Sequence, residues 1–255
     1  MLIDVHAHLD DEAFDADRDE VIQKIKEAGM VVVNAGSDLK TSEFSVEMAQ
    51  KYDFIYVCVG VHPHEAAKAP EDYLETLRQM AKYEKVVAMG EIGLDYYYDF
   101  CDKDTQKKVF GEQLALAKEL DLPVVVHDRE AHQDTLKILQ ESGVKKGLMH
   151  CYSGSYELAG EFMKLGFYFS FGGTITFKNA KRPKEIVSKL PLDKILLETD
   201  CPYLTPEPYR GKRNDPTKVE IIAQALANLR GISKEEVENT TTANAQRLFK
   251  FAKPI

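Results

Sequence analysis

The chain has 255 residues, of which 44% are hydrophobic, and a formal net charge of −9. This is enough for one large core, while the absence of an apolar run of about 18 residues argues against a transmembrane helix. An acidic chain does not attract nucleic acid over its whole surface, so a polyanionic substrate would need a local group of metal ions or basic residues. The N-terminus lacks the pattern of a signal peptide, and the four cysteines are widely spaced. We therefore expect a cytoplasmic protein with neither a disulfide framework nor a membrane partner.

Short apolar runs alternate with longer amphipathic segments along the chain. In chain order we expect strand 1–6, helix 17–29, strand 31–36, helix 40–51, strand 54–61, helix 71–83, strand 86–91, helix 104–120, strand 122–127, helix 130–142, strand 147–151, helix 156–165, strand 167–172, helix 180–190, strand 194–199 and helix 217–230. Ser233 and Glu236 have the spacing of a capping box that opens one more helix, to about Phe249. Gly29, Gly143 and Gly166 stand where helix C-caps are expected.

Most of the apolar runs are nearly continuous, which is typical of parallel strands covered on both faces. Eight such strands, each followed by a helix, predict an α/β fold of the (β/α)₈ TIM-barrel type, with a single domain over residues 1–255. A doubly wound open sheet is the alternative.

Metal-binding residue types stand where the expected strands end. The active site of a parallel barrel forms at the C-terminal ends of its strands, and these positions hold His6, His8, Glu91, His127, His150 and Asp200. Two of them, His6 and His8, have a single residue between them, so a strand would direct both to one face. Each residue alone is compatible with a core histidine or a solvated carboxylate, but together they predict a metal centre.

Four imidazoles and two carboxylates are too many for one tetrahedral ion. They suffice for two divalent cations with positions open to water and substrate. Glu91 can bridge the cations because a carboxylate has two oxygens, and Asp200 can ligate and also accept a proton from the attacking water. The predicted reaction is hydrolysis by a water that two metal ions activate, with Glu91 and Asp200 as catalytic residues.

Several motifs carry a family resemblance over nearly the whole chain. They are DVHAHL at 4–9, GVHPH at 60–64, GEIGLDYY at 90–97, VHDREA at 126–131, HCYSG at 150–154, ETDCPYL at 198–204, RGKRN at 210–214 and NAQRLF at 244–249. With these motifs the chain resembles the TatD family of metal-dependent deoxyribonucleases, which are amidohydrolase-like metallo-barrels.

The resemblance implies a particular division of the ligands between two ions. His6, His8, Glu91 and Asp200 would hold one ion, and Glu91, His127 and His150 the other. It also implies action on DNA, often as a 3′-to-5′ exonuclease. The chain departs from the family after His127, where it reads Asp128-Arg129-Glu130 in place of a small polar residue followed by Arg-Asp; this leaves the ligands intact. Histidine ligands favour Zn or Mn, whereas phosphodiester chemistry and the resemblance to the TatD family favour Mg.

Three further residues lie near the expected strand ends without belonging to the ligand set. We interpret His62 and His64 as substrate contacts, with loop packing as the alternative for one of them. Glu198 is expected to orient a ligand histidine from behind, or else to be a buried structural carboxylate.

Basic side chains gather in the loops after the last two expected strands, at Lys178, Lys181, Arg182, Arg210, Lys212 and Arg213. Phosphate groups are often held on this side of a barrel, although surface charges need no function. Arg210 and Arg213 are the preferred phosphate contacts because a guanidinium can bind phosphate through two hydrogen bonds. Tyr96, Tyr97 and Tyr98 could stack on an unpaired base or simply cover the rim of the barrel.

Two enzymatic hypotheses follow from this site. The first is a deoxyribonuclease of the 3′–5′ exonuclease type, with two divalent ions per chain and with DNA as its partner, preferably single-stranded or with frayed ends. The alternative is an amidohydrolase-type enzyme that cleaves an amide, ester or lactone with the same metal pair. A nucleic-acid-binding module with a vestigial metal site is disfavoured because Glu91 and Asp200 are both present. No obligate protein partner is indicated.

Overall fold

Eight parallel strands form one sheet in sequential order in the computed structural model, which describes residues 1–251. They are β1 (Ile3–Ala7), β2 (Val31–Ala35), β3 (Ile55–Val59), β4 (Val86–Asp95), β5 (Val124–Arg129), β6 (Gly147–Met149), β7 (Phe167–Phe171) and β8 (Ile195–Leu197). Because the strand order never reverses, the doubly wound alternative is excluded and the (β/α)₈ barrel is confirmed. The last residues of the predicted domain, 252–255, lie outside the described residues.

The first and last strands meet through hydrogen bonds between their C-terminal extensions. The backbone N–H of Asp200 donates to the carbonyl of His6 at 2.9 Å, and that of His8 donates to the carbonyl of Cys201 at 2.9 Å. The buried carboxylate of Asp4 also accepts the N–H of Thr199 at 2.9 Å. These bonds bring the C-terminal ends of β1 and β8 together.

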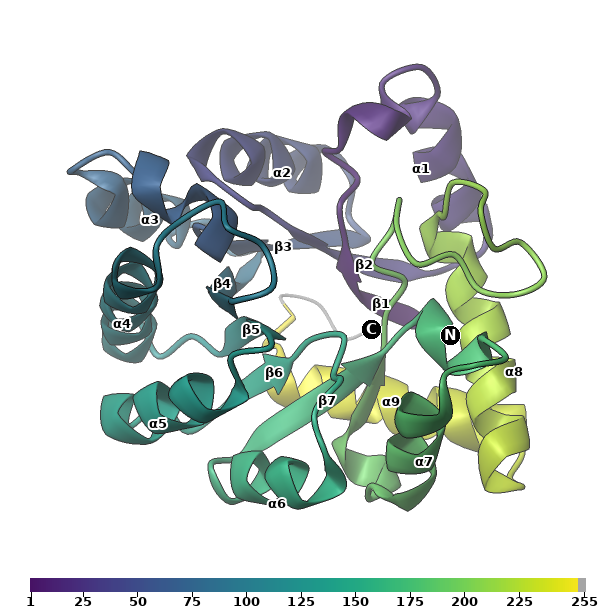
Figure 1. The fold of residues 1–255 in the computed structure, drawn as a ribbon. Coiled ribbons are helices and arrows are strands. Elements are labelled where there is room, and N and C mark those ends of the chain that lie inside the picture. Colours follow the sequence, from purple (N-terminus) through teal and green to yellow (C-terminus); the bar gives the residue numbers. More distant parts are fainter. Residues whose placement is uncertain (252–255) are drawn as a thin grey trace.

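Helices surround the barrel, as Figure 1 shows. Those in the described residues are α1 (Arg18–Glu27), α2 (Leu39–Lys51), α3 (Tyr73–Met80), α4 (Lys103–Glu119), α5 (His132–Ser142), α6 (Tyr156–Lys164), α7 (Lys181–Lys189), α8 (Val219–Arg230) and α9 (Lys234–Leu248). The three predicted cap glycines follow α1, α5 and α6 with positive φ, and Ser233 caps α9 by accepting the N–H of Glu236 at 3.0 Å. None of these helices is long and apolar enough to span a membrane.

The core has two layers. A smaller cluster lies inside the barrel and includes Val5, Val33 and Val125, together with Leu248 and Phe249 at the end of α9. A larger cluster fills the space between strands and helices. Since α9 packs against β1 and β8 from behind the strands (Figure 1), one end of the barrel is closed and the site can form only at the other.

The β1–β2 pairing contains an irregularity that determines where the first histidines point. Val5 belongs to the interior cluster, so strict alternation would direct His6 outward. The register shifts between Asp4 and Ala7, and such a bulge changes which face the following side chains occupy. His6 and His8 therefore both face the barrel axis, as the one-residue spacing predicted.

Candidate metal centre

Side chains from five strand ends converge at the open end of the barrel. Both His6 Nε2 and His8 Nε2 lie close to Glu91 Oε2, at 3.2 and 3.7 Å, and His8 Nε2 is 3.4 Å from Asp200 Oδ1. The other Glu91 oxygen, Oε1, lies 2.7 Å from His127 Nδ1 and 3.0 Å from His150 Nε2. The structure thus brings all six predicted ligands into one cluster, with Glu91 at its centre.

The backbone around Glu91 requires glycine because β4 and β5 approach closely. A Cβ at Gly93, whose φ is +148°, would lie 2.0 Å from the carbonyl oxygen of His127. A Cβ at Gly90 would lie 2.7 Å from the Cβ of Val125. The two glycines therefore let Glu91 stand beside His127 with only 3% of its surface exposed.

The electrostatics of the cluster favour ionised carboxylates beside histidines. Burial alone would raise the pKa of Glu91, but the neighbouring His150, His62 and His6 hold it well below its ordinary value. Burial likewise opposes ionisation of Asp200, whereas the hydrogen bond from His8 lowers its pKa. Burial would lower the pKa of His8, yet Asp200 and Glu91 raise it to about 9. A cation bound here would displace protons from histidine and take over the neutralisation of the carboxylates.

The donor set fits divalent cations. Three groups have ligand atoms that all lie within 4.8 Å of one another: His6, Glu91 and His150; His6, His8 and Asp200; and His62, Glu91 and His127. Buried imidazoles and carboxylates that converge in this way are typical of metal ligands.

Comparison with known protein families identifies the family of this chain. The family model described as TatD related DNase matches residues 3–250. This chain belongs to the TatD-related DNase family.

Relatives within the family cover almost the full chain. It is 49% identical to the uncharacterized metal-dependent hydrolase YabD of Bacillus subtilis, over 98% of this chain and 100% of the relative. It is 34% identical to the 3'-5' ssDNA/RNA exonuclease TatD of Erwinia tasmaniensis, over 97% of this chain and 99% of the relative. The crystal structure of YJJV, a TatD homologue from Escherichia coli, superposes with a TM-score of 0.92 at 32% identity and covers 98% of each chain.

The second histidine pair of this TatD family member lies beside the same cluster. His62 Nε2 is 3.5 Å from Glu91 Oε1, and burial lowers the pKa of His62 to about 4, so its ring is neutral. His64 lies farther out and is 24% exposed. His62 therefore lies in the same cluster as Glu91 and His127. The sequence did not indicate that His62 would lie so close to these two predicted ligands.

A functional residue that sequence reasoning missed is Asp95. Its Oδ2 lies 3.0 Å from His127 Nε2 and 2.9 Å from His64 Nε2, while its Oδ1 accepts the backbone N–H groups of Tyr97 and Tyr98. Although burial opposes ionisation, the bonds from His127 and His64 hold the pKa of Asp95 well below its usual range. If the Nε2–H of His127 donates to Asp95, Nδ1 is left unprotonated beside Glu91 and would be available to a cation.

The expected strand ended at Glu91, but β4 continues through Asp95. The additional residues pair with β5, with Gly93 opposite His127 and Asp95 opposite Arg129. Because side chains alternate, Glu91, Gly93 and Asp95 lie on one face. Extending the strand by this spacing would have revealed the carboxylate.

Asp95→Asn is expected to weaken metal binding about 10- to 100-fold. The amide oxygen would stay with the two backbone N–H groups, so the NH₂ group would face His127 and force a proton onto Nδ1. Isothermal titration of the metal-free variant with Mn²⁺ or Zn²⁺ measures the effect, and Asp99→Asn, an exposed change on the same loop, is the control. An affinity equal to wild type would show that Asp95 does not orient His127.

The predicted supporting carboxylate, Glu198, lies beside His150. Its Oε2 is 3.4 Å from His150 Nδ1, and it accepts a hydrogen bond from Ser170 Oγ. Its Oε1 accepts the N–H of Cys151 at 2.8 Å. Glu198 is fully buried and both its oxygens are used.

The two predicted phosphate contacts occupy different environments. Both line an open pocket that none of the six predicted metal ligands lines. The guanidinium of Arg213 is engaged by Asp17 through two hydrogen bonds of 2.7 and 2.6 Å. Arg210 lies over the ring of Phe177, 4.2 Å from its centroid, and no carboxylate within the described residues pairs with it. Arg210 is thus the more available of the two.

Proposed function

We propose that this chain is a 3′-to-5′ exodeoxyribonuclease that acts through two divalent cations, with residues 1–255 as one catalytic domain. The observation that carries the proposal is the position of Glu91 between two groups of histidines. One oxygen faces His6 and His8, and the other faces His127 and His150. A carboxylate so placed is suited to bridge two cations. The family of the chain, and the relative named as an ssDNA/RNA exonuclease, support DNA as the substrate.

In this proposal His6, His8, Asp200 and one oxygen of Glu91 would hold one cation, and His127, His150 and the second oxygen of Glu91 would hold the other. Bound divalent cations supply a water that ionises near neutral pH and positive charge for the phosphate oxygens. Imidazole ligands favour Mn or Zn, while Mg remains compatible with the carboxylates.

Asp200 is the proton acceptor in this proposal. Its Oδ1 lies among His6 and His8, and its side chain is 14% exposed, so a water can reach it. Because the hydrogen bond from His8 lowers its pKa despite burial, Asp200 is a carboxylate at neutral pH and can take the proton.

The remaining predicted residues serve the substrate or the ligands. His62 is neutral and can donate one hydrogen bond to a phosphate oxygen beside Glu91. His64 lies farther out than His62, at the open end of the barrel. Arg210 binds the backbone farther along the strand, with Arg213 available only if it leaves Asp17. Glu198 holds His150 from behind.

The direct test is a nuclease assay on end-labelled oligonucleotides. We expect the metal-loaded protein to shorten single-stranded DNA from its 3′ end, and blunt duplex more slowly. Excess chelator should stop the reaction, and Mn²⁺ or Mg²⁺ in excess of the chelator should restore it. The proposal is wrong if no divalent ion supports DNA cleavage while a panel of esters, amides and lactones is turned over.

A further inference from the structure

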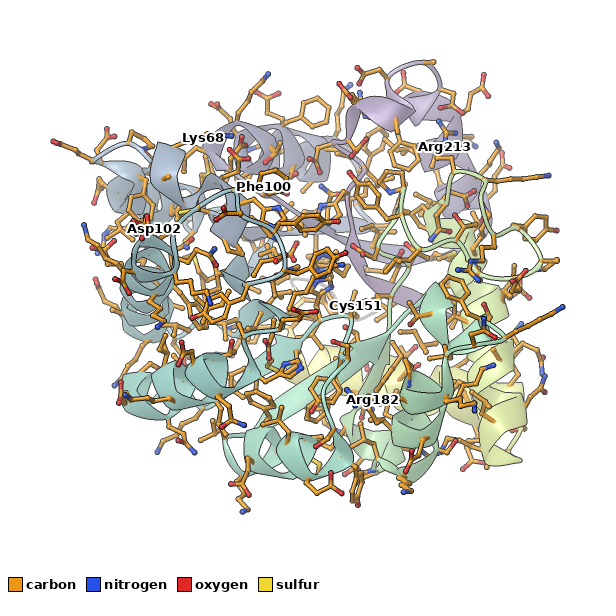
Figure 2. All side chains as sticks on the ribbon, in the orientation of Figure 1. Lys68, Phe100, Asp102, Cys151, Arg182 and Arg213 are labelled. Carbon is orange, nitrogen blue, oxygen red and sulfur yellow. The ribbon has the colours of Figure 1, made fainter. Side chains whose placement is uncertain are left out.

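The loop after β4 exposes three aromatic side chains beside the metal cluster. Tyr97, Tyr98 and Phe100 are 54%, 41% and 63% exposed. Single exposed aromatics are ordinary, but several on one short loop form a surface that is suited to bind a ligand. In Figure 2, Phe100 lies on the loop between β4 and α4, and Arg213 lies on a different side of the strand ends, on the loop that precedes α8.

These side chains are ordered against one another. The rings of Tyr98 and Phe100 stack with centroids 5.3 Å apart and an angle of 23° between their planes. The guanidinium of Arg129 lies 4.8 Å from the centroid of Tyr98 and 4.0 Å from that of Tyr97. Arg129 is exposed, and within residues 1–251 no carboxylate lies within ion-pair distance of it. We call Tyr98, Phe100 and Arg129 the stacking platform.

The platform is tied directly to the metal cluster. The ring of His64 contacts Phe100 and Tyr98 edge-on, with centroids 4.8 and 5.4 Å apart. His64 also shares the carboxylate of Asp95 with His127. The same carboxylate accepts the N–H of Tyr98, so one buried group fixes both the platform and a predicted metal ligand.

We propose that the stacking platform binds the unpaired base next to the scissile phosphate of a single-stranded DNA end. The inference rests on the proposed function and deepens it. A nucleobase stacks on aromatic rings whatever its sequence, and the free cation of Arg129 attracts the phosphate that follows. A base inside a duplex has both faces covered by its neighbours, so the platform accepts only an unstacked one. The platform thereby provides a physical reason for a single-strand preference.

The test compares two single-stranded oligonucleotides that differ at one nucleotide. One carries a normal base next to the bond to be cut, and the other an abasic tetrahydrofuran residue there. For wild type we expect kcat/KM to favour the base by roughly 5- to 100-fold, the range of one base–aromatic stack. Phe100→Ala should lose most of this preference, so that its kcat/KM values for the two oligonucleotides become nearly equal.

Two further variants control for folding and for aromatic loss in general. Phe100→Tyr keeps a ring and should keep the preference. Tyr83→Ala removes another exposed aromatic, at the opposite end of the barrel before β4, and should behave as wild type. If wild type cleaves DNA but Phe100→Ala keeps the full preference for the base, the proposed role of the stacking platform is wrong, while the proposed nuclease function is supported. If wild type cleaves neither oligonucleotide with any divalent ion, the proposed function itself fails, and the platform fails with it.

Discussion

Glu91→Gln is expected to reduce kcat/KM on single-stranded DNA by roughly 10³-fold or more, because several kcal/mol of charge stabilisation depend on the cations. Glutamine has the shape of glutamate but no charge, and only its amide oxygen can donate a lone pair to a cation. Its NH₂ group would face either His6 or the pair of His127 and His150. One of the two proposed cation sites therefore loses the oxygen ligand from residue 91 whichever way the amide turns.

Metal analysis by mass spectrometry after gel filtration separates this loss from a folding defect. We expect wild type to retain more ions per chain than Glu91→Gln, while thermal unfolding of the variant in chelator remains cooperative but at a lower temperature, because the neighbouring histidines lose their counter-charge. The matched control is Glu84→Gln, an exposed glutamate just before β4, which should keep both metal and activity. A Glu91→Gln protein with wild-type metal content and rate would remove the bridge from the mechanism.

The arrangement of the six predicted ligands could be inferred from sequence because it depends on a rule of the fold. Parallel strands in a barrel end at one rim, so polar residues that follow apolar runs meet there whatever the details of packing. The positions of His6, Glu91 and Asp200 relative to the strand ends suffice for this inference. The bulge in β1 that turns His6 inward is not visible in the sequence, although the position of the His6 ring depends on that bulge.

Pairings between distant residues could not be inferred in the same way. Arg213 is bound by Asp17, and nothing in either segment marks the other as its partner. As a result the sequence treats both Arg210 and Arg213 as free cations, whereas of these two arginines only Arg210 has no carboxylate partner among the described residues. The role of Asp95 was hidden for a different reason: the apolar run of β4 is broken by Glu91, so the strand appeared to end four residues too early.

Asp200→Asn is the second change with a large expected effect. Removing a general base costs typically about 10²- to 10⁴-fold in rate, and we expect a fall of that size in kcat at saturating Mn²⁺. Metal should still bind, because the amide oxygen of asparagine can remain a ligand near His8, so the loss should be in kcat more than in metal affinity. Asp193→Asn, an exposed change just before β8, is the matched control.

The pH dependence of that variant distinguishes a proton acceptor from a simple ligand. In wild type the pKa of Asp200 is lowered, so its carboxylate form is present above the acid range and kcat should change little between neutral and mildly alkaline pH. In Asp200→Asn the rate at saturating Mn²⁺ should rise with pH, because hydroxide from solvent replaces the missing base. If kcat of Asp200→Asn were instead reduced by the same factor at every pH, Asp200 would be assigned to metal binding alone. The proton would then have to pass to another side chain of the cluster.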